Sequence, residues 1–149
     1  MQLDHAWLLN HLPHQGSMCL LDRIAAWDTR AIRAVASSHR NQDNPLRAHG
    51  RLGAACGIEY AAQAMAAHSA LLTVPGRPSR IGYLTSVRGV ELQVSRLDDI
   101  AADLLVEAER LSGDLNTLLY EFRISAGEKW LLMGRIAVVL NAAKRGRQP

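Results

Sequence analysis

The sequence predicts an α+β protein in which one antiparallel sheet of about six strands curls around a single long helix. Three observations lead to this prediction. An alanine-rich helical segment occupies the middle of the chain, two strand-like segments precede it, and four more follow it. Strands joined by short turns, as the last ones are, must run antiparallel. The length of 149 residues fits one domain, residues 1–149, in which residues 142–149 are expected to form a flexible tail.

The segment before the long helix is expected to hold one short helix and two strands. The short helix covers residues 6–10, and Pro13 disfavours its continuation. The compact apolar run at residues 18–24 predicts the first strand. Residues 30–37 predict the second, because Ile32, Ala34 and Ala36 recur at every second position and so share one face.

The long helix is expected to begin at residue 53 or 54 and to end near residue 72. Eight of the seventeen residues from 54 to 70 are alanine, the residue with the highest helix propensity. Pro75 and Pro78 end the pattern. Since small side chains let other backbone approach closely, this composition suits a helix that is wrapped by a sheet.

Four strands are expected after the helix, at residues 81–94, 103–111, 118–124 and 130–140. In the third, apolar residues from Leu118 to Ile124 recur at every second position, which predicts a half-buried strand. Turn-forming residues at 112–114 and 125–128 separate the last three. The last strand is apolar on both faces except at Arg135, which predicts a central place in the sheet. Because one helix cannot cover such a sheet and an edge strand would stay open, we expect a homodimer or a heterodimer that joins sheet edges.

Composition and motifs exclude several classes of function. The net charge of +3 is mild, and no basic stripe alternates with aromatic residues, so nucleic-acid binding is not expected. No run approaches 18 consecutive apolar residues, so no membrane span is expected. Cys19 and Cys56 lack metal-ligand spacing and suggest reduced thiols in a cytoplasmic protein. No phosphate-binding loop, dinucleotide fingerprint or zinc spacing is present.

Glu59 is the leading candidate for chemistry. Carboxylates are rarely buried without a partner, yet this one stands near the start of an alanine-rich core helix. It could stabilise the helix N-terminus. It could also lie beside a substrate pocket and donate or accept a proton. At about 100° per residue, Gln63 shares its helix face and His68 points away from it.

The residues next to Glu59 suggest two further roles. Small residues at a helix start can leave backbone N–H groups accessible to a carbonyl oxygen, which makes Cys56 and Gly57 candidate substrate-binding residues, although simple packing is the alternative. His49, in the loop before the helix, is the best available general base. His14 follows a proline and is interpreted as structural. The histidines without a functional context are His5, His39 and His68.

Two segments carry a family resemblance. Residues 12–24, LPHQGSMCLLDRI, and residues 59–66, EYAAQAMA, resemble the opening and the central-helix motif of bacterial 3-hydroxyacyl-ACP dehydratases. The chain looks most like a divergent branch associated with aryl-polyene pathways, some members of which pair with a second subunit. The resemblance implies the hotdog fold, in which an antiparallel sheet wraps a long helix.

The resemblance also implies a mechanism. A histidine removes the C2 proton of the thioester, a helix carboxyl of the neighbouring subunit protonates the departing 3-hydroxyl, and a helix N-terminal N–H polarises the carbonyl. The carboxyl carries over to Glu59, and Gln63 matches the motif glutamine, a candidate for substrate binding. His49 is the candidate base, although it stands ten residues before Glu59 instead of fourteen and lacks the phenylalanine and prolines of the usual run.

The function expected from this resemblance is dehydration of a 3-hydroxyacyl thioester to the trans-2-enoyl thioester, in fatty-acid or polyketide-like biosynthesis. Acyl carrier protein would deliver the substrate on its phosphopantetheine, and no metal or organic cofactor is expected. Arg77, Arg80 and Arg88 could meet the acidic carrier. Two alternatives remain: an acyl-thioester hydrolase in which Glu59 activates water, and a non-catalytic partner subunit of a heterodimeric dehydratase.

Overall fold

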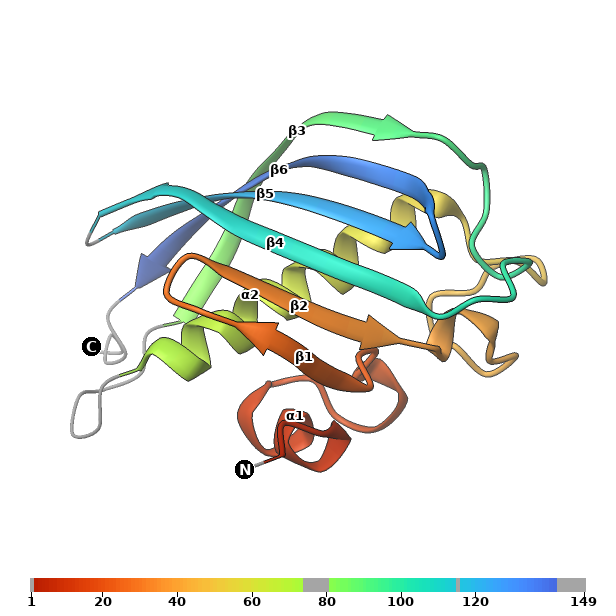
Figure 1. Cartoon of the computed structure of the whole chain (residues 1–149), viewed down its shortest axis with the longest axis horizontal. Coiled ribbons are helices and arrows are strands. Elements are labelled where there is room, and N and C mark those ends of the chain that lie inside the picture. The colour runs from red at the N-terminus through yellow and green to blue at the C-terminus, as the bar shows by residue number, and fades with distance from the viewer. Residues whose placement is uncertain (1, 74–80, 115, 142–149) are drawn as a thin grey trace, which may run out of the picture.

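A computed structural model describes residues 2–73, 81–114 and 116–141. Six strands form one antiparallel sheet in the order β1-β2-β4-β5-β6-β3. The sheet curls around the long helix α2, as Figure 1 shows. The predicted α+β architecture is therefore confirmed, and so is the inner position of the last strand, which lies between β5 and β3. The predicted tail at residues 142–149 and the two prolines after the helix lie outside the described residues.

The elements follow the predicted order. The first helix and turn are α1, His5–His11, and η1, Gly16–Met18. The next elements are β1, Arg23–Trp27, β2, Ala31–Ala36, and η2, Ser38–Arg40. The turn η3, Ala54–Cys56, leads into α2, Gly57–Leu72. The last four strands are β3, Ile81–Leu92, β4, Leu104–Gly113, β5, Thr117–Ala126, and β6, Lys129–Asn141.

The first strand differs from its prediction. It was expected at residues 18–24, but β1 begins at Arg23 and continues to Trp27. Cys19, Leu20 and Leu21 are buried, and the Leu20 N–H group donates to the side chain of Gln63 on α2. A short apolar run indicates burial, but it does not distinguish a strand from a buried connecting segment.

The side-chain alternation predicted for two strands is confirmed. Every second residue of β2 is buried, as is every second residue of β5. These side chains form the core on the inner face of the sheet, against α2. Register is therefore strongly specified, because a slip by one residue would turn each buried set toward solvent. The buried residues of these two faces are Ile32, Ala34, Ala36, Leu118, Tyr120, Phe122, Ile124 and Ala126.

The start of α2 lies close to the sheet at Gly57. A Cβ atom at this position would lie 2.9 Å from both terminal carbons of the Leu132 side chain and 3.1 Å from Ile124 Cδ1. A larger residue would require the ends of these two side chains to move. Glycine therefore allows close packing of the first helical turn on the side chains of β5 and β6, and Glu59 stands on that turn.

The two edges of the sheet differ. At the β1 edge, the Ile24 N–H group donates to the Leu3 carbonyl at 2.8 Å, and α1 lies beside β1 in Figure 1. At the other edge, β3 pairs with β6 alone among the described strands. Its residues Leu84 and Leu92 are each 48% exposed. The open β3 edge is therefore where the expected joining of sheets would take place.

Candidate active site

Three polar side chains meet at the start of the central helix. Glu59 lies in the first turn of α2, where the helix dipole favours a carboxylate. Its Oε2 atom lies 3.2 Å from His14 Nε2 and 3.3 Å from Gln63 Nε2. The side chain of Glu59 is 35% exposed and that of His14 is 25% exposed. The predicted shared face of Glu59 and Gln63 is confirmed, and the group is reachable from solvent.

Gln63 is the buried member of the group. Its Oε1 atom accepts from the Leu20 N–H group at 2.9 Å, and its Nε2 atom donates to the Met18 carbonyl at 2.7 Å as well as to Glu59. The whole side chain is inaccessible to solvent. The amide is therefore fixed in place by partners within the chain, and its predicted role in substrate binding stays a prediction.

His14 belongs to this site, although the sequence interpretation made it structural. It lies in the loop between α1 and η1, and only its Nε2 atom has a partner. Its Nδ1 atom is buried without a hydrogen-bond partner among the described residues. No local spacing connects residue 14 with residue 59. The available sequence signal is that the two residues lie in the two segments that carry the family resemblance.

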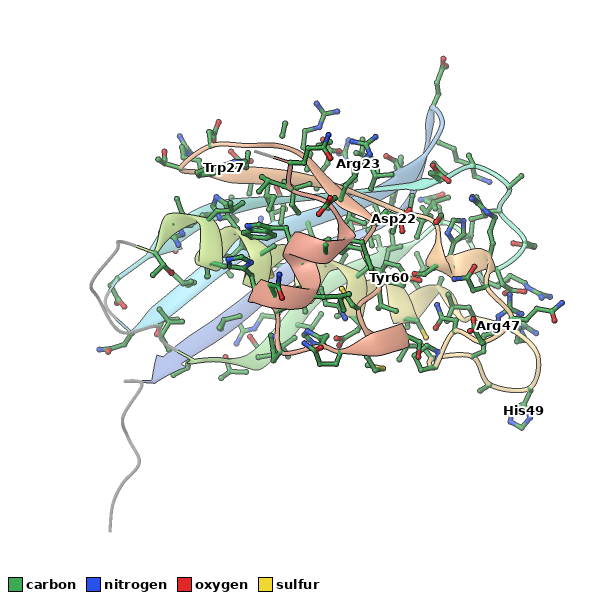
Figure 2. The ribbon with its side chains drawn as sticks, turned by 90° about the horizontal axis from the view of Figure 1, so that it is seen from below. Asp22, Arg23, Trp27, Arg47, His49 and Tyr60 are labelled. Atoms are coloured by element: carbon green, nitrogen blue, oxygen red, sulfur yellow. The ribbon has the colours of Figure 1, made fainter. Side chains whose placement is uncertain are left out.

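His49 makes no ion pair or hydrogen bond with Glu59 within the described chain. It lies in an exposed turn in which Ala48 and Arg51 exchange two backbone hydrogen bonds. His49 and Gly50 have φ values of 54° and 76°, which is typical of a type I′ turn. Figure 2 shows His49 at the outer tip of this loop, pointing away from the body of the protein. Its role as a general base stays a prediction and would require a second subunit.

Charged residues hold the loop that carries His49. Arg47 is only 16% exposed, and its guanidinium donates to three backbone carbonyls of the loop. Asp98 accepts from the Leu52 N–H group at 2.8 Å and from the Arg96 guanidinium. The Arg96 guanidinium, with help from that N–H group, holds the pKa of Asp98 well below its ordinary range. The loop before α2 is therefore fixed mainly by ionised groups.

Cys56 and Gly57 lie within one turn of Glu59. The Cys56 Sγ atom is 3.9 Å from the Leu46 carbonyl, and burial raises the pKa of this thiol. The Gly57 N–H group donates to the Ala54 carbonyl. Cys56 is thus a protonated thiol at neutral pH, and Gly57 uses its N–H group within the helix start. The substrate-binding roles expected for both residues stay predictions.

Buried polar side chains hold α2 on faces other than that of Glu59. The Tyr60 hydroxyl lies 2.7 Å from Ser38 Oγ and 3.1 Å from Asn44 Nδ2. His68 points away from Glu59, as predicted. Its Nδ1 atom lies 2.6 Å from the Tyr120 hydroxyl, and its Nε2 atom lies 2.7 Å from the Asp28 carbonyl. These contacts fix the rotation of the helix and so keep Glu59 directed away from the core.

Two hollows lie on the surface of the described chain, away from Glu59. A hollow of about 460 Å³ lies between the N-terminal segment and β1, and another of about 520 Å³ lies on the outer face of β2, β4 and β5. Glu59 lines neither hollow. Within the described ranges, no three His, Cys, Asp or Glu side chains gather as metal ligands would. None of the described helices is long and apolar enough to cross a membrane.

Comparison with known families gave one match that spans nearly the whole chain. Residues 8–145 match the family model for ApeP-like proteins, described as ApeP dehydratase. A search of the curated proteins found no match.

Solved structures with the same fold include one dehydratase assembly and several thioesterases. The dehydratase heterocomplex ApeI:P from Xenorhabdus doucetiae gives a TM-score of 0.79 at 22% identity, covering 91% of both chains. A mutant thioesterase from Pseudomonas aeruginosa gives 0.66 at 16% identity, covering 92% of this chain and 93% of its own. A thioesterase from Haemophilus influenzae gives 0.63 at 12% identity, covering 85% and 82%. These similarities show the hotdog fold that the sequence predicted.

Proposed function

The chain belongs to the ApeP-like dehydratase family, and on that premise we propose that it acts on a 3-hydroxyacyl thioester carried by acyl carrier protein. The proposed product is the trans-2-enoyl thioester. The observation that carries this proposal is the solvent-accessible carboxyl of Glu59, which His14 and Gln63 hold on the first turn of the central helix.

The proposed reaction is an elimination that needs one base and one acid. The base takes the C2 proton, the electron pair of the C2–H bond forms the C2–C3 double bond, and the C3–O bond breaks. Glu59 gives its proton to the departing oxygen, which leaves as water. Proton transfer between side chains needs no metal ion or organic cofactor. We therefore expect full activity after dialysis against a chelator.

A second hotdog subunit is part of the proposed site. Two observations support it: β3 is an open sheet edge, and His49 lies on an exposed turn. The structurally similar ApeI:P assembly is a heterocomplex, which favours a partner of different sequence over a second copy. In the proposed arrangement, the base comes from one subunit and the Glu59 carboxyl from the other.

Acyl carrier protein is the proposed carrier of the substrate. Carrier proteins are acidic, and an exposed arginine could bind one. Arg88 is exposed on β3, next to the open edge. Arg77 and Arg80, the other two candidates, lie outside the described residues.

The experiment that tests this function is a dehydration assay with a panel of 3-hydroxyacyl-ACP substrates. The wild-type chain is assayed alone and with a hotdog subunit encoded beside it, together with Glu59→Gln and His49→Asn. Asparagine is chosen because it tolerates the left-handed backbone at residue 49, where alanine would be strained. Loss of activity in His49→Asn would then result from removal of the imidazole and not from strain in the turn.

The outcomes distinguish the proposed mechanism from its alternatives. Enoyl product that both substitutions abolish supports the two-residue mechanism. Loss in Glu59→Gln alone assigns the base to another residue. Free thiol instead of enoyl product would favour the hydrolase alternative. Product that needs this chain but persists in Glu59→Gln would make the chain a non-catalytic partner, and no enoyl product in any mixture would overturn the proposal.

A further inference from the structure

We infer that His14 is a positioning residue which determines which oxygen of Glu59 carries the transferable proton. The inference rests on the proposed acid role of Glu59 and adds a residue to that site. Two observations support it. His14 Nε2 lies 3.2 Å from Glu59 Oε2, and the other ring nitrogen, Nδ1, is buried.

The surroundings of His14 select its protonation state. The Nδ1 atom is buried and has no hydrogen-bond partner among the described residues. A protonated ring would place an N–H donor at that buried position, and buried donors without acceptors are rare in folded proteins. The same holds for the neutral form with its proton on Nδ1. The remaining form is the neutral ring with its proton on Nε2, the atom that lies 3.2 Å from Glu59 Oε2.

This tautomer makes the two oxygens of Glu59 unequal. Oε2 lies 3.2 Å from His14 Nε2 and accepts an N–H bond from Gln63. An oxygen that already faces two donor groups is the poorer place for a proton of its own. Oε1 accepts no hydrogen bond from any residue that the structure describes. The proton of the neutral acid therefore lies on Oε1, the oxygen that is free to face a substrate.

His14 acts through Glu59 and not on the substrate directly. Its Nε2 atom lies 3.2 Å from the carboxylate and its Nδ1 atom is buried, so neither nitrogen is presented to a substrate. Gln63 also holds the chain that follows His14, through the Met18 carbonyl and the Leu20 N–H group. The segment that follows His14 is thus hydrogen-bonded to Gln63, so the two side chains that lie near Oε2 are held together.

The test compares two substitutions in the complete dehydratase, with its partner subunit if one is required. His14→Phe keeps an aromatic ring and removes the donor, and His14→Gln keeps an N–H group near the position of Nε2. We expect kcat to fall by about 10- to 100-fold in His14→Phe with KM nearly unchanged, and to recover most of that loss in His14→Gln. His11→Phe is the matched control, because His11 is an exposed histidine of α1.

A second measurement is independent of activity. The ¹⁵N shifts of the His14 ring identify its tautomer by NMR, and we expect the neutral form protonated on Nε2 at neutral pH. An imidazolium or an Nδ1-protonated ring would overturn the inference. So would unchanged kcat in His14→Phe, or His14→Gln as impaired as His14→Phe, which would indicate a packing role. If the wild type makes no enoyl product, the proposed function fails, and the tautomer alone decides whether His14 donates to Glu59.

Discussion

The side-chain nitrogen of Gln63 lies 3.3 Å from Glu59 Oε2, across one turn of α2, and 2.7 Å from the Met18 carbonyl. One amide therefore touches both the candidate acid and the buried segment before β1. The fold of the N-terminal segment and the geometry of the site depend on the same side chain. Substitutions of Gln63 should consequently affect stability as well as activity.

Replacing Gln63 with leucine should lower the free energy of unfolding by about 2–4 kcal/mol. The change leaves the Leu20 N–H group and the Met18 carbonyl without their partners in a buried site. Urea unfolding followed by circular dichroism measures the loss. Gln15→Leu is the control, because Gln15 is exposed and bonds only to nearby carbonyls. A loss no larger than that of the control would contradict the prediction.

Asp98→Asn should destabilise the protein at neutral pH and have a smaller effect in acid. The pKa of Asp98 is lowered in the folded state, chiefly by Arg96. A lowered carboxyl pKa contributes stability above the ordinary pKa, near 3.8, and the contribution is lost as the pH falls below it. The difference in Tm between wild type and Asp98→Asn at pH 7 and pH 3 checks this. Asp99→Asn is the control, since Asp99 is 61% exposed; a difference independent of pH would refute the ionic explanation.

His39 and His68 should make the protein less stable in mild acid. Burial is the main cause that lowers the pKa of each ring below its ordinary value of 6.5. Between that value and the folded pKa the unfolded chain binds more protons, so stability is complete above about pH 6.5 and falls as the pH decreases. One proton corresponds to at most about 1.4 kcal/mol per pH unit.

Unfolding free energies measured from pH 7.5 to 5.5 test this dependence. His68→Gln should flatten the slope, whatever it does to stability at pH 7.5, because it removes one of the two buried rings. His11→Phe replaces an exposed histidine and should leave the slope as in the wild type. An equal slope in wild type and His68→Gln would show that His68 does not contribute.

Charge placed on the open edge of the sheet should weaken subunit association. Leu84 and Leu92 lie on β3 and are each 48% exposed. Lysine at either position would bury a charge if a second subunit extended the sheet there. We expect the dissociation constant, measured by analytical ultracentrifugation, to rise by about tenfold or more. Leu111→Lys, on an exposed leucine of β4, should leave association unchanged; an equal effect there would point to another interface.

Local sequence patterns were sufficient for most of the fold. The alternation in β2 and β5 predicted their buried faces because side chains of a strand point to opposite sides at every step. Helical geometry placed Gln63 beside Glu59 and His68 on the other side, and both placements are confirmed. The apolar run at residues 18–24 predicted burial correctly and the strand incorrectly. Hydrophobicity does not determine whether the backbone groups bond to a neighbouring strand or to a side chain.

Local patterns along the chain were enough to predict the α+β class, the alanine-rich central helix, the buried faces of the strands and the helix face that carries Glu59. These features depend on contacts between residues a few positions apart. Long-range packing instead brings His14, 45 residues before Glu59, against its carboxylate and leaves His49, ten residues before it, on an exposed turn. The loop after α1 reaches Glu59 because Gln63 bonds the following segment to α2, and packing of this kind joins distant residues that no local periodicity relates.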